Sequence, residues 1–489
     1  MFKKISTCLI VLSFNLLYSN QSYDIGELSI LEAEAIALKH NQNLAILRQQ
    51  VDEKKMDYYQ KISTYFPSLS YEGEVTYNQY QDDGHRDSYD STFTLDQEIY
   101  STDKIFSISE AKLDFESQKM LYEEEVNNLL LKVRTAYYNV VLSKKNIDVA
   151  REEIQLLKLQ LEKELETRDI NLEKYLAETE TGKEIKDSKK QESKDAGQVS
   201  DYEVNQVKVR LSDSHVAYHE MFEQWNVSQS NLIRLLGLDL DTVLDLKIRE
   251  TDLPLQQYPI IKKYIALLIE MRNETLRELF QYRKLFSDKE EKFWRQKAIE
   301  NRPVIKYLSL QERVAEEKLN AQKAKYLPSL SAQGEYKSNT SSGKGFIHLD
   351  YEWSCGVTLS WNLFDSFNRE FGIQKYVSNK LQAQIAYESG VQDTYLAVRN
   401  AFQLLDKSLQ NYLSALDGLQ SAELALEEAK EKLSMNQIGA LDYRESVFAH
   451  TKTLFRLNTA SFNVLSAYFQ LEYLEGGYLN NHYKYSVER

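Results

Sequence analysis

The hexapeptide Tyr65-Phe66-Pro67-Ser68-Leu69-Ser70 recurs 261 residues later as Tyr326-Leu327-Pro328-Ser329-Leu330-Ser331. Before each copy the apolar residues follow a helical period, and after it they alternate with polar residues. Because a proline disfavours helical backbone at the residue before it, Pro67 and Pro328 are predicted to end a helix and open a strand. The recurrence predicts a chain made of two copies of one structural unit.

Two other pairs of segments keep nearly the same offset. Leu95–Tyr100 matches Leu359–Phe364 after 264 residues, and Val133–Tyr137 matches Val398–Phe402 after 265 residues. The order and spacing of these matches indicate a duplication rather than chance. Each copy is predicted to hold two strands and a long helical hairpin, the first copy within residues 21–245 and the second within 301–475.

The four predicted strands alternate between apolar and polar side chains. They lie at about residues 68–80, 89–99, 329–338 and 349–361. In the last strand the odd positions from Tyr351 to Trp361 are apolar or aromatic, and the even positions between them are polar or Gly. One apolar face with aromatic ends is typical of a transmembrane barrel, whose outside contacts lipid and whose inside contacts water. We therefore predict that Tyr351, Trp353 and Trp361 form a lipid-facing girdle.

Four strands cannot close a barrel by themselves, and an open sheet edge is not tolerated in lipid. A membrane barrel would therefore need strands from further copies of the chain. The same alternation also fits two hairpins on the surface of a soluble domain, because one face of such a sheet is solvated.

Heptad patterns predict long helices in both halves. The first pattern runs from Val126 to Leu161 with one break at Lys144, and the second runs from Val398 to Leu433. A helix over about residues 104–161 would be roughly 85 Å long at 1.5 Å per residue. Few globular domains need helices of this length.

Residues 1–20 have the layout of a secretory signal peptide, with a basic start, an apolar run from Ile10 to Leu17 and small polar residues after it. No later stretch reaches the roughly 20 consecutive apolar residues of a transmembrane helix. Cys8 lies inside the signal segment, which makes a lipidated N-terminus a weak alternative. Cleavage of the signal peptide would remove Cys8 and leave Cys355 without a partner for an intrachain disulfide.

The charge balance argues against nucleic-acid binding, and the motifs argue against an enzyme. The chain has 60 Lys and Arg against 74 Asp and Glu, a net charge of -14, and no concentrated basic face. No nucleophile elbow, phosphate loop, dinucleotide fingerprint or paired-cysteine pattern occurs. The nearest metal candidate is His215 with His219, which would need a third ligand from elsewhere. We therefore predict no catalytic residues, no cofactor and no resident metal.

Taken together, the repeated segments resemble the TolC-like outer-membrane efflux protein family. The resemblance runs through Leu28–Ala37, Leu235–Gly237, Arg302-Pro303 and Leu359–Asp365 as well as both strand entries. It implies a mainly α-helical chain with a β-barrel part, in a duplicated unit of two strands plus a long helical hairpin. By resemblance, three copies form a 12-stranded outer-membrane barrel continuous with a periplasmic α-helical tube.

The resemblance also implies a constriction at the periplasmic end. Family members turn each helical hairpin near a glycine, with a polar residue three positions later and an acid six positions later. The matching residues here are Gly197, Ser200 and Glu203 in the first half and Gly439, Asp442 and Glu445 in the second. Glu445, Asp442 and Glu203 are accordingly the implied pore constriction, where a ring of carboxylates would attract cations. They are also compatible with ordinary solvated helix residues, and Phe448 stands where the family has a second acid.

The first hairpin is longer than the second by 23 residues between matched points. The excess falls in residues 167–196, a charged segment predicted as a helix extension or a mobile loop near the hairpin end. It is either a docking feature for a partner or a solvated insertion. Residues 246–300 are predicted as a linker in the middle of the tube, and residues 476–489 as a C-terminal tail.

Two functional hypotheses follow. The first is a passive exit duct of a tripartite efflux or type I secretion system, a homotrimer in outer-membrane lipid that extends into the periplasm. A periplasmic adaptor and an inner-membrane transporter would be its partners. The second is a periplasmic or secreted coiled-coil scaffold that forms no channel. Detergent-stable trimers in outer-membrane fractions distinguish the first hypothesis from the second.

Overall fold

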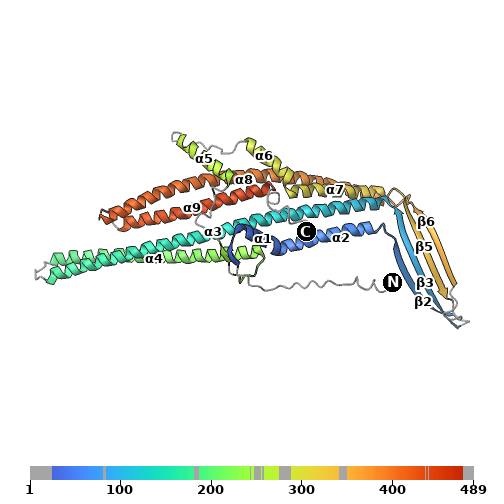
Figure 1. The fold of residues 1–489 in the computed structure, drawn as a ribbon, viewed down its shortest axis with the longest axis horizontal. Coiled ribbons are helices and arrows are strands. Elements are labelled where there is room, and N and C mark those ends of the chain that lie inside the picture. Colours follow the sequence, from blue (N-terminus) through green and yellow to red (C-terminus); the bar gives the residue numbers. More distant parts are fainter. Residues whose placement is uncertain are drawn as a thin grey trace. The chain divides into compact units, whose positions relative to one another are not determined.

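Long helices and one antiparallel sheet make up most of the chain, as a computed structural model shows (Figure 1). The structure describes residues 25–80, 84–180, 187–242, 244–246, 255, 258–274, 288–340, 350–435, 437–438 and 440–476. The chain divides into two units, each described by itself. The hairpin-end unit is Met1–Asn41, Ala136–Leu253 and Lys432–Thr451, and the sheet unit is Gln42–Thr135, Pro254–Glu431 and Lys452–Arg489.

The sheet unit contains a four-stranded sheet in the order β2-β3-β5-β6, antiparallel throughout. Its strands are β2 (Ser68–Tyr80), β3 (Gly84–Tyr100), β5 (Ser329–Thr340) and β6 (Asp350–Ser360). The pairing of β3 with β5 joins the two halves and places Phe93 opposite Tyr336. β3 begins earlier and β5 ends later than predicted, because polar residues such as Ser88 still pair through their backbone groups.

Each strand pair begins at the proline singled out in the sequence. Pro67 directly precedes β2 and Pro328 directly precedes β5. The helix before each proline ends in a tight turn, in which Phe66 N donates to Ser63 O at 3.0 Å and Leu327 N donates to Ala324 O at 2.9 Å. The two halves therefore pass from helix to strand in the same way.

The two halves also make an equivalent hydrogen bond at matching positions of the repeat. Gln97 Nε2 donates to the carbonyl of Tyr65 at 2.5 Å in the first half, and Trp361 Nε1 donates to the carbonyl of Tyr326 at 3.0 Å in the second. Gln97 and Trp361 occupy the same place in the repeat, as do the two tyrosines. Each bond ties the end of the second strand to the start of the first.

The four longest helices are α3 (Thr102–Glu180), α4 (Asp187–Leu236), α8 (Asn368–Ser434) and α9 (Ala440–Leu474). The predicted heptad positions Leu130 and Val140 of α3 are fully buried, and so is Leu405 of α8. In α8 the pattern later drifts, since Leu416 is 38% exposed and Ala415 is buried in its place. Such drift is expected because a straight helix turns every 3.6 residues rather than 3.5.

The heptad break at Lys144 has a structural cause in the hairpin-end unit. The ammonium of Lys144 on α3 lies 5.3 Å from the ring centroid of Trp225 on α4. An aromatic face attracts a cation, so this pair fills the position where the pattern lacks an apolar residue. At the break in the pattern, α3 therefore contacts α4 through Lys144 and Trp225 instead of through an apolar side chain.

The remaining described elements are shorter. They are β1 (Ile25–Leu28), α1 (Ile30–His40), α2 (Gln42–Ser63), β4 (Leu244–Leu246), α5 (Pro259–Glu274), α6 (Asp288–Asn301) and α7 (Pro303–Ala324). β1 pairs in parallel with β4. Ser29 caps α1 and forms a capping box with Glu32, which satisfies two backbone N–H groups at the helix start.

The return helices, α4 and α9, are the second helices of the two hairpins. Each is followed by a glycine with the same left-handed backbone conformation. Gly237 follows α4 with φ +72°, and Gly476 follows α9 with φ +74°. A Cβ on Gly237 would clash with the carbonyl of His40, and one on Gly476 would lie 3.0 Å from the carbonyl of Asn301. Each glycine therefore lets a return helix end directly against the break between two short helices of its own half.

A buried polar cluster lies beside Gly476 in the sheet unit. Glu124 Oε1 accepts from Tyr473 Oη at 2.6 Å and from Arg302 Nη2 at 3.1 Å, and its Oε2 accepts from Val304 N at 3.3 Å. Arg302 Nη1 also donates to Thr394 Oγ1 at 3.3 Å. The carboxylate of Glu124 on α3 therefore joins the start of α7 and the end of α9, and Arg302 adds α8 through Thr394.

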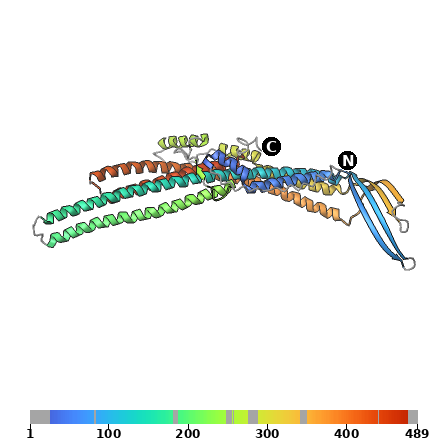
Figure 2. The ribbon, with the colours of Figure 1, turned by 60° about the horizontal axis from the view of Figure 1, so that its bottom comes forward.

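The end of the first hairpin differs from its prediction. Gly197 lies inside α4, so the prediction that it marks the turn is wrong. α3 continues to Glu180 and α4 begins at Asp187, so most of the 167–196 insertion lengthens the two helices. A single glycine costs a helix about 1 kcal/mol and cannot stop one that favourable neighbours continue. Figures 1 and 2 show the α3–α4 end extending beyond the start of α9.

Several predicted segments lie wholly or partly outside the described residues. The signal peptide at 1–20 lies outside them, as do Gly439 and the tail beyond Gly476. The linker at 246–300 is described where it forms α5 and α6. Within the described part of the chain, no helix is both long and apolar enough to span a membrane.

Candidate functional site at the helix-hairpin ends

The predicted acids of the second half lie on the first turns of α9, in the hairpin-end unit. Asp442 and Glu445 are both exposed. Glu203 lies on α4, and its side chain is outside the described ones. Position 439 falls between the end of α8 at Ser434 and the start of α9 at Ala440.

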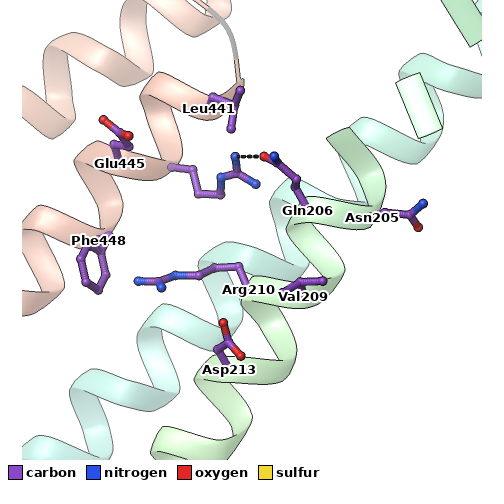
Figure 3. A pocket seen from close by; sticks show the side chains of 9 residues that line it. Asn205, Gln206, Val209, Arg210, Asp213, Leu441, Glu445 and Phe448 are labelled. Atoms are coloured by element: carbon purple, nitrogen blue, oxygen red, sulfur yellow. Dashed lines mark hydrogen bonds between the residues drawn. The ribbon is translucent and has the colours of Figure 1, made fainter. Parts of the chain in front are cut away.

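A groove of about 590 Å³ runs between α4 and the first turns of α9 (Figure 3). Its lining residues come from both helices: Asn205, Gln206, Val209, Arg210, Asp213, Leu441, Arg444, Glu445 and Phe448. Glu445 thus lines the groove, and Asp442 is not among the lining residues. The groove brings an element of the first repeat against an element of the second.

Arg210 links three helices at this groove. Its guanidinium lies 4.0 Å from the ring centroid of Phe448 on α9, and Figure 3 shows the side chain reaching toward that ring. Its Nη2 also lies 4.0 Å from a carboxylate oxygen of Glu153 on α3, which accepts from Ser214 Oγ at 3.2 Å. Phe448, where an acid was expected, therefore receives a cation from the neighbouring hairpin.

Arg444 forms a second tie between the two hairpins. Its Nη2 donates to Gln206 Oε1 on α4 at 2.8 Å, the dashed line in Figure 3. Arg444 directly precedes Glu445 in the sequence, so a cation and an anion lie next to each other on the first turns of α9. Burial raises the pKa of the neighbouring Tyr443 phenol above its ordinary value.

Sequence reasoning missed Arg210 and Arg444 because it looked only for acids at this end. Their positions were readable, since Arg444 stands five residues after Gly439 and Arg210 seven residues after Glu203. Two guanidinium groups beside the groove offset the charges of Glu445 and Asp213. The site therefore has mixed charge, and the contacts of Arg444 with Gln206 and of Arg210 with Phe448 join α4 to α9.

The outer face of β6 is the second candidate site. Tyr351 and Trp353 are 72% and 73% exposed, and Val357 and Leu359 are each 65% exposed. Trp361 lies just beyond the end of β6 and is 59% exposed. A continuous apolar strip of this kind marks a surface that another apolar phase covers.

No group of three or more potential metal ligands occurs among the described residues. The imidazole of His219 lies edge-on to the ring of Tyr218, with centroids 5.7 Å apart. The structure therefore gives His219 an aromatic neighbour and adds no third ligand to the pair with His215.

Comparisons with known proteins agree on family and fold. A family model described as outer membrane efflux protein matches residues 35–205 and 294–441. The chain is similar to the Campylobacter jejuni CmeC outer membrane channel, with a TM-score of 0.68 at 15% identity, covering 92% of this chain and 85% of that one. No curated protein sequence matches the chain.

Two further solved structures show the same likeness. The open state of the Neisseria gonorrhoeae MtrE outer membrane channel matches with a TM-score of 0.68 at 15% identity, covering 91% of this chain and 88% of that one. The Vibrio cholerae outer membrane protein VceC matches with a TM-score of 0.65 at 12% identity, covering 91% and 96%. At these identities the likeness establishes the fold, a mainly helical chain with strands of a barrel.

Proposed function

The chain belongs to the outer membrane efflux protein family, and we propose that it is the passive exit duct of a tripartite efflux or type I secretion system. As a member of that family it is an outer-membrane transport protein and not an enzyme. In the proposed role it supplies a water-filled path from the periplasm or from a pump to the exterior. An inner-membrane transporter would supply the energy, and a periplasmic adaptor would connect the two.

The observation that carries this proposal is the uncovered apolar face of the sheet. From Tyr351 to Leu359, the odd-numbered large side chains of β6 are exposed, and the chain buries none of them against its own helices. Lipid is the phase that covers such a strip in an outer-membrane strand. Because the sheet ends in β2 and β6, both edges need partner strands in lipid. A homotrimer would supply them and give a barrel of about 12 strands.

In this proposal the groove between α4 and α9 belongs to the gate. The hydrogen bond from Arg444 to Gln206 and the contact of Arg210 with Phe448 hold the ends of the two hairpins together. Opening by a partner would pull α9 away from α4 and break both contacts. Glu445 and Asp442 would then contribute carboxylates near the entrance, as would Glu203 from α4.

The duct is tested by cell fractionation together with planar-bilayer recording. We expect detergent-stable, heat-modifiable trimers in outer-membrane fractions, and single channels after reconstitution. Soluble monomer alone would favour the coiled-coil scaffold and refute the duct. For the constriction, Glu445→Gln should lower the preference for cations. An unchanged conductance and ion preference would show that Glu445 is an ordinary surface residue.

A further inference from the structure

The junction between β6 and α8 differs from the matching junction of the first half. In the first half only Ser101 separates β3 from α3, whereas in the second half residues 361–367 form a turn. Within this turn Ser366 and Phe367 have φ values of 58° and 65°. Bulky residues rarely adopt this left-handed region, so the fold enforces a backbone that the side chains disfavour. Strain of this kind persists only where the surroundings hold it, and it is common at functional sites.

The side chain of Arg369 acts as a clamp on the 361–367 turn by binding its backbone carbonyls and Asp365. It is buried, and its guanidinium donates to the carbonyls of Asn362 at 2.8 Å and Leu363 at 3.1 Å. Its Nε also lies 3.1 Å from a carboxylate oxygen of Asp365. Asp365 and Arg369 are the only charged residues from 361 to 369, so the turn presents no unpaired charge.

The same turn exposes three large apolar side chains to solvent. Leu363 is 74% exposed, Phe364 69% and Phe367 59%. The rings of Phe364 and Phe367 contact each other edge to face, with centroids 5.7 Å apart. Because the clamp fixes the backbone, these side chains are held outward at little further cost in conformational entropy.

The exposed residues continue the apolar strip of β6. Val357 and Leu359 are exposed on one face of the strand, and Trp361 and Leu363, which follow the end of β6 in the sequence, are exposed as well. Figure 1 shows that this end of the sheet is the one from which α3 and α8 leave. Exposed apolar side chains therefore occur both on β6 and on the turn that follows it.

We propose that the 361–367 turn is a membrane anchor, which inserts Leu363, Phe364 and Phe367 into the boundary between headgroups and acyl chains of the periplasmic leaflet. The proposal rests on the proposed function, because it requires β6 to face lipid. Aromatic side chains concentrate at this depth of a bilayer. A rigid aromatic turn at the base of the sheet, whose one charged residue, Asp365, is paired with Arg369, would set how deeply the sheet sits in the membrane.

Depth-dependent quenching of a fluorophore tests the anchor. In a Cys355→Ser background, an environment-sensitive dye is attached to Phe367→Cys or, as a second variant, to Phe364→Cys. Val357→Cys on β6 and Ser378→Cys on α8 serve as references for lipid and water. The proteins are reconstituted in phosphatidylethanolamine and phosphatidylglycerol vesicles that contain lipids with a nitroxide near the headgroup or deep in the chain.

We expect both turn labels to lose more fluorescence to the shallow nitroxide than to the deep one, and to be shielded from iodide. Quenching by iodide alone, while the Val357→Cys label is quenched by lipid, would overturn the anchor and leave the lipid-facing sheet intact. Shielding from both quenchers would place the turn against a second copy and would also overturn the anchor. Iodide quenching at all positions would instead refute the membrane-embedded sheet itself.

Discussion

Removing the two ties between α4 and α9 should open the entrance in the absence of any partner. The bond from Arg444 to Gln206 is charge-assisted and 2.8 Å long. In a half-buried place such a bond contributes about 1 kcal/mol, once solvent screening is allowed for. The contact of Arg210 with the ring of Phe448, at 4.0 Å, contributes about 0.5–1 kcal/mol at an exposed site. In the proposed gating role, these two contacts together would favour the closed arrangement of each chain by roughly 1.5–2 kcal/mol.

The size of the effect follows from the number of chains that open together. Since 1.4 kcal/mol is a factor of ten, Arg444→Ala should raise the open-to-closed ratio about fivefold per chain. A concerted trimer would multiply three such effects, which gives an increase on the order of 100-fold. Because the two ties involve different residue pairs, Arg444→Ala with Phe448→Ala should have a larger effect than either change alone.

Single-channel recording in planar bilayers measures this ratio directly as open-state occupancy. Arg456→Ala is a matched control, because Arg456 is exposed on α9 and does not line the groove. An unchanged occupancy in the double variant, with trimers of normal stability, would refute the gate reasoning. An equal effect of Arg456→Ala would show that loss of any positive charge on α9 produces the change.

Three further predictions concern the stability of the sheet unit, measured by thermal unfolding. Glu124→Ala leaves the guanidinium of Arg302, 15% exposed, without its carboxylate, and should cost about 3–5 kcal/mol, whereas Glu124→Gln should cost less. Burial and the carboxylate of Glu124 raise the pKa of Tyr473 to about 12. Because the pKa of Tyr473 is higher in the folded state than in the unfolded state, the protonated phenol stabilises the fold fully below pH 10, and this stabilisation is lost as the pH rises toward 12. Tyr473→Phe should reduce that alkaline loss of stability. Gly476→Ala should cost about 1 kcal/mol or more because of its positive φ, whereas Gly356→Ala meets open space and should be nearly neutral. Equal melting temperatures for the two glycine variants, or an alkaline loss as steep in Tyr473→Phe as in the parent chain, would contradict these assignments.

Features that depend on short-range patterns were predictable from the sequence. Pro67 and Pro328 mark strand entries because proline limits the backbone of the residue before it. The buried stripe of α3 follows from heptad spacing, and the face of β6 follows from a period of two. Gly197 failed as a turn signal because helix-compatible residues on both sides outweigh the small cost of one glycine.

Features that depend on tertiary contact left little trace in the sequence. Arg210 and Phe448 come from different repeats, so their contact is set by how the two hairpins pack. Lys144 breaks the heptad pattern, and the contact with Trp225 that accounts for it joins residues 81 positions apart in the sequence. Nothing in the pair Ser366-Phe367 signals a left-handed backbone, because that conformation is imposed by the clamp below the turn.

The two left-handed glycines also bear on how members of this family can change in length. Gly237 and Gly476 fix where each return helix stops, and the prolines fix where each strand pair starts. Between these fixed points the remaining free ends are the hairpin tips. α3 and α4 have 79 and 50 residues, whereas α8 and α9 have 67 and 35. At 1.5 Å per residue, the additional length per helix amounts to about 20 Å. The hairpin tips are therefore the places where residues can be added to or removed from this chain while the fixed ends of its helices stay where they are.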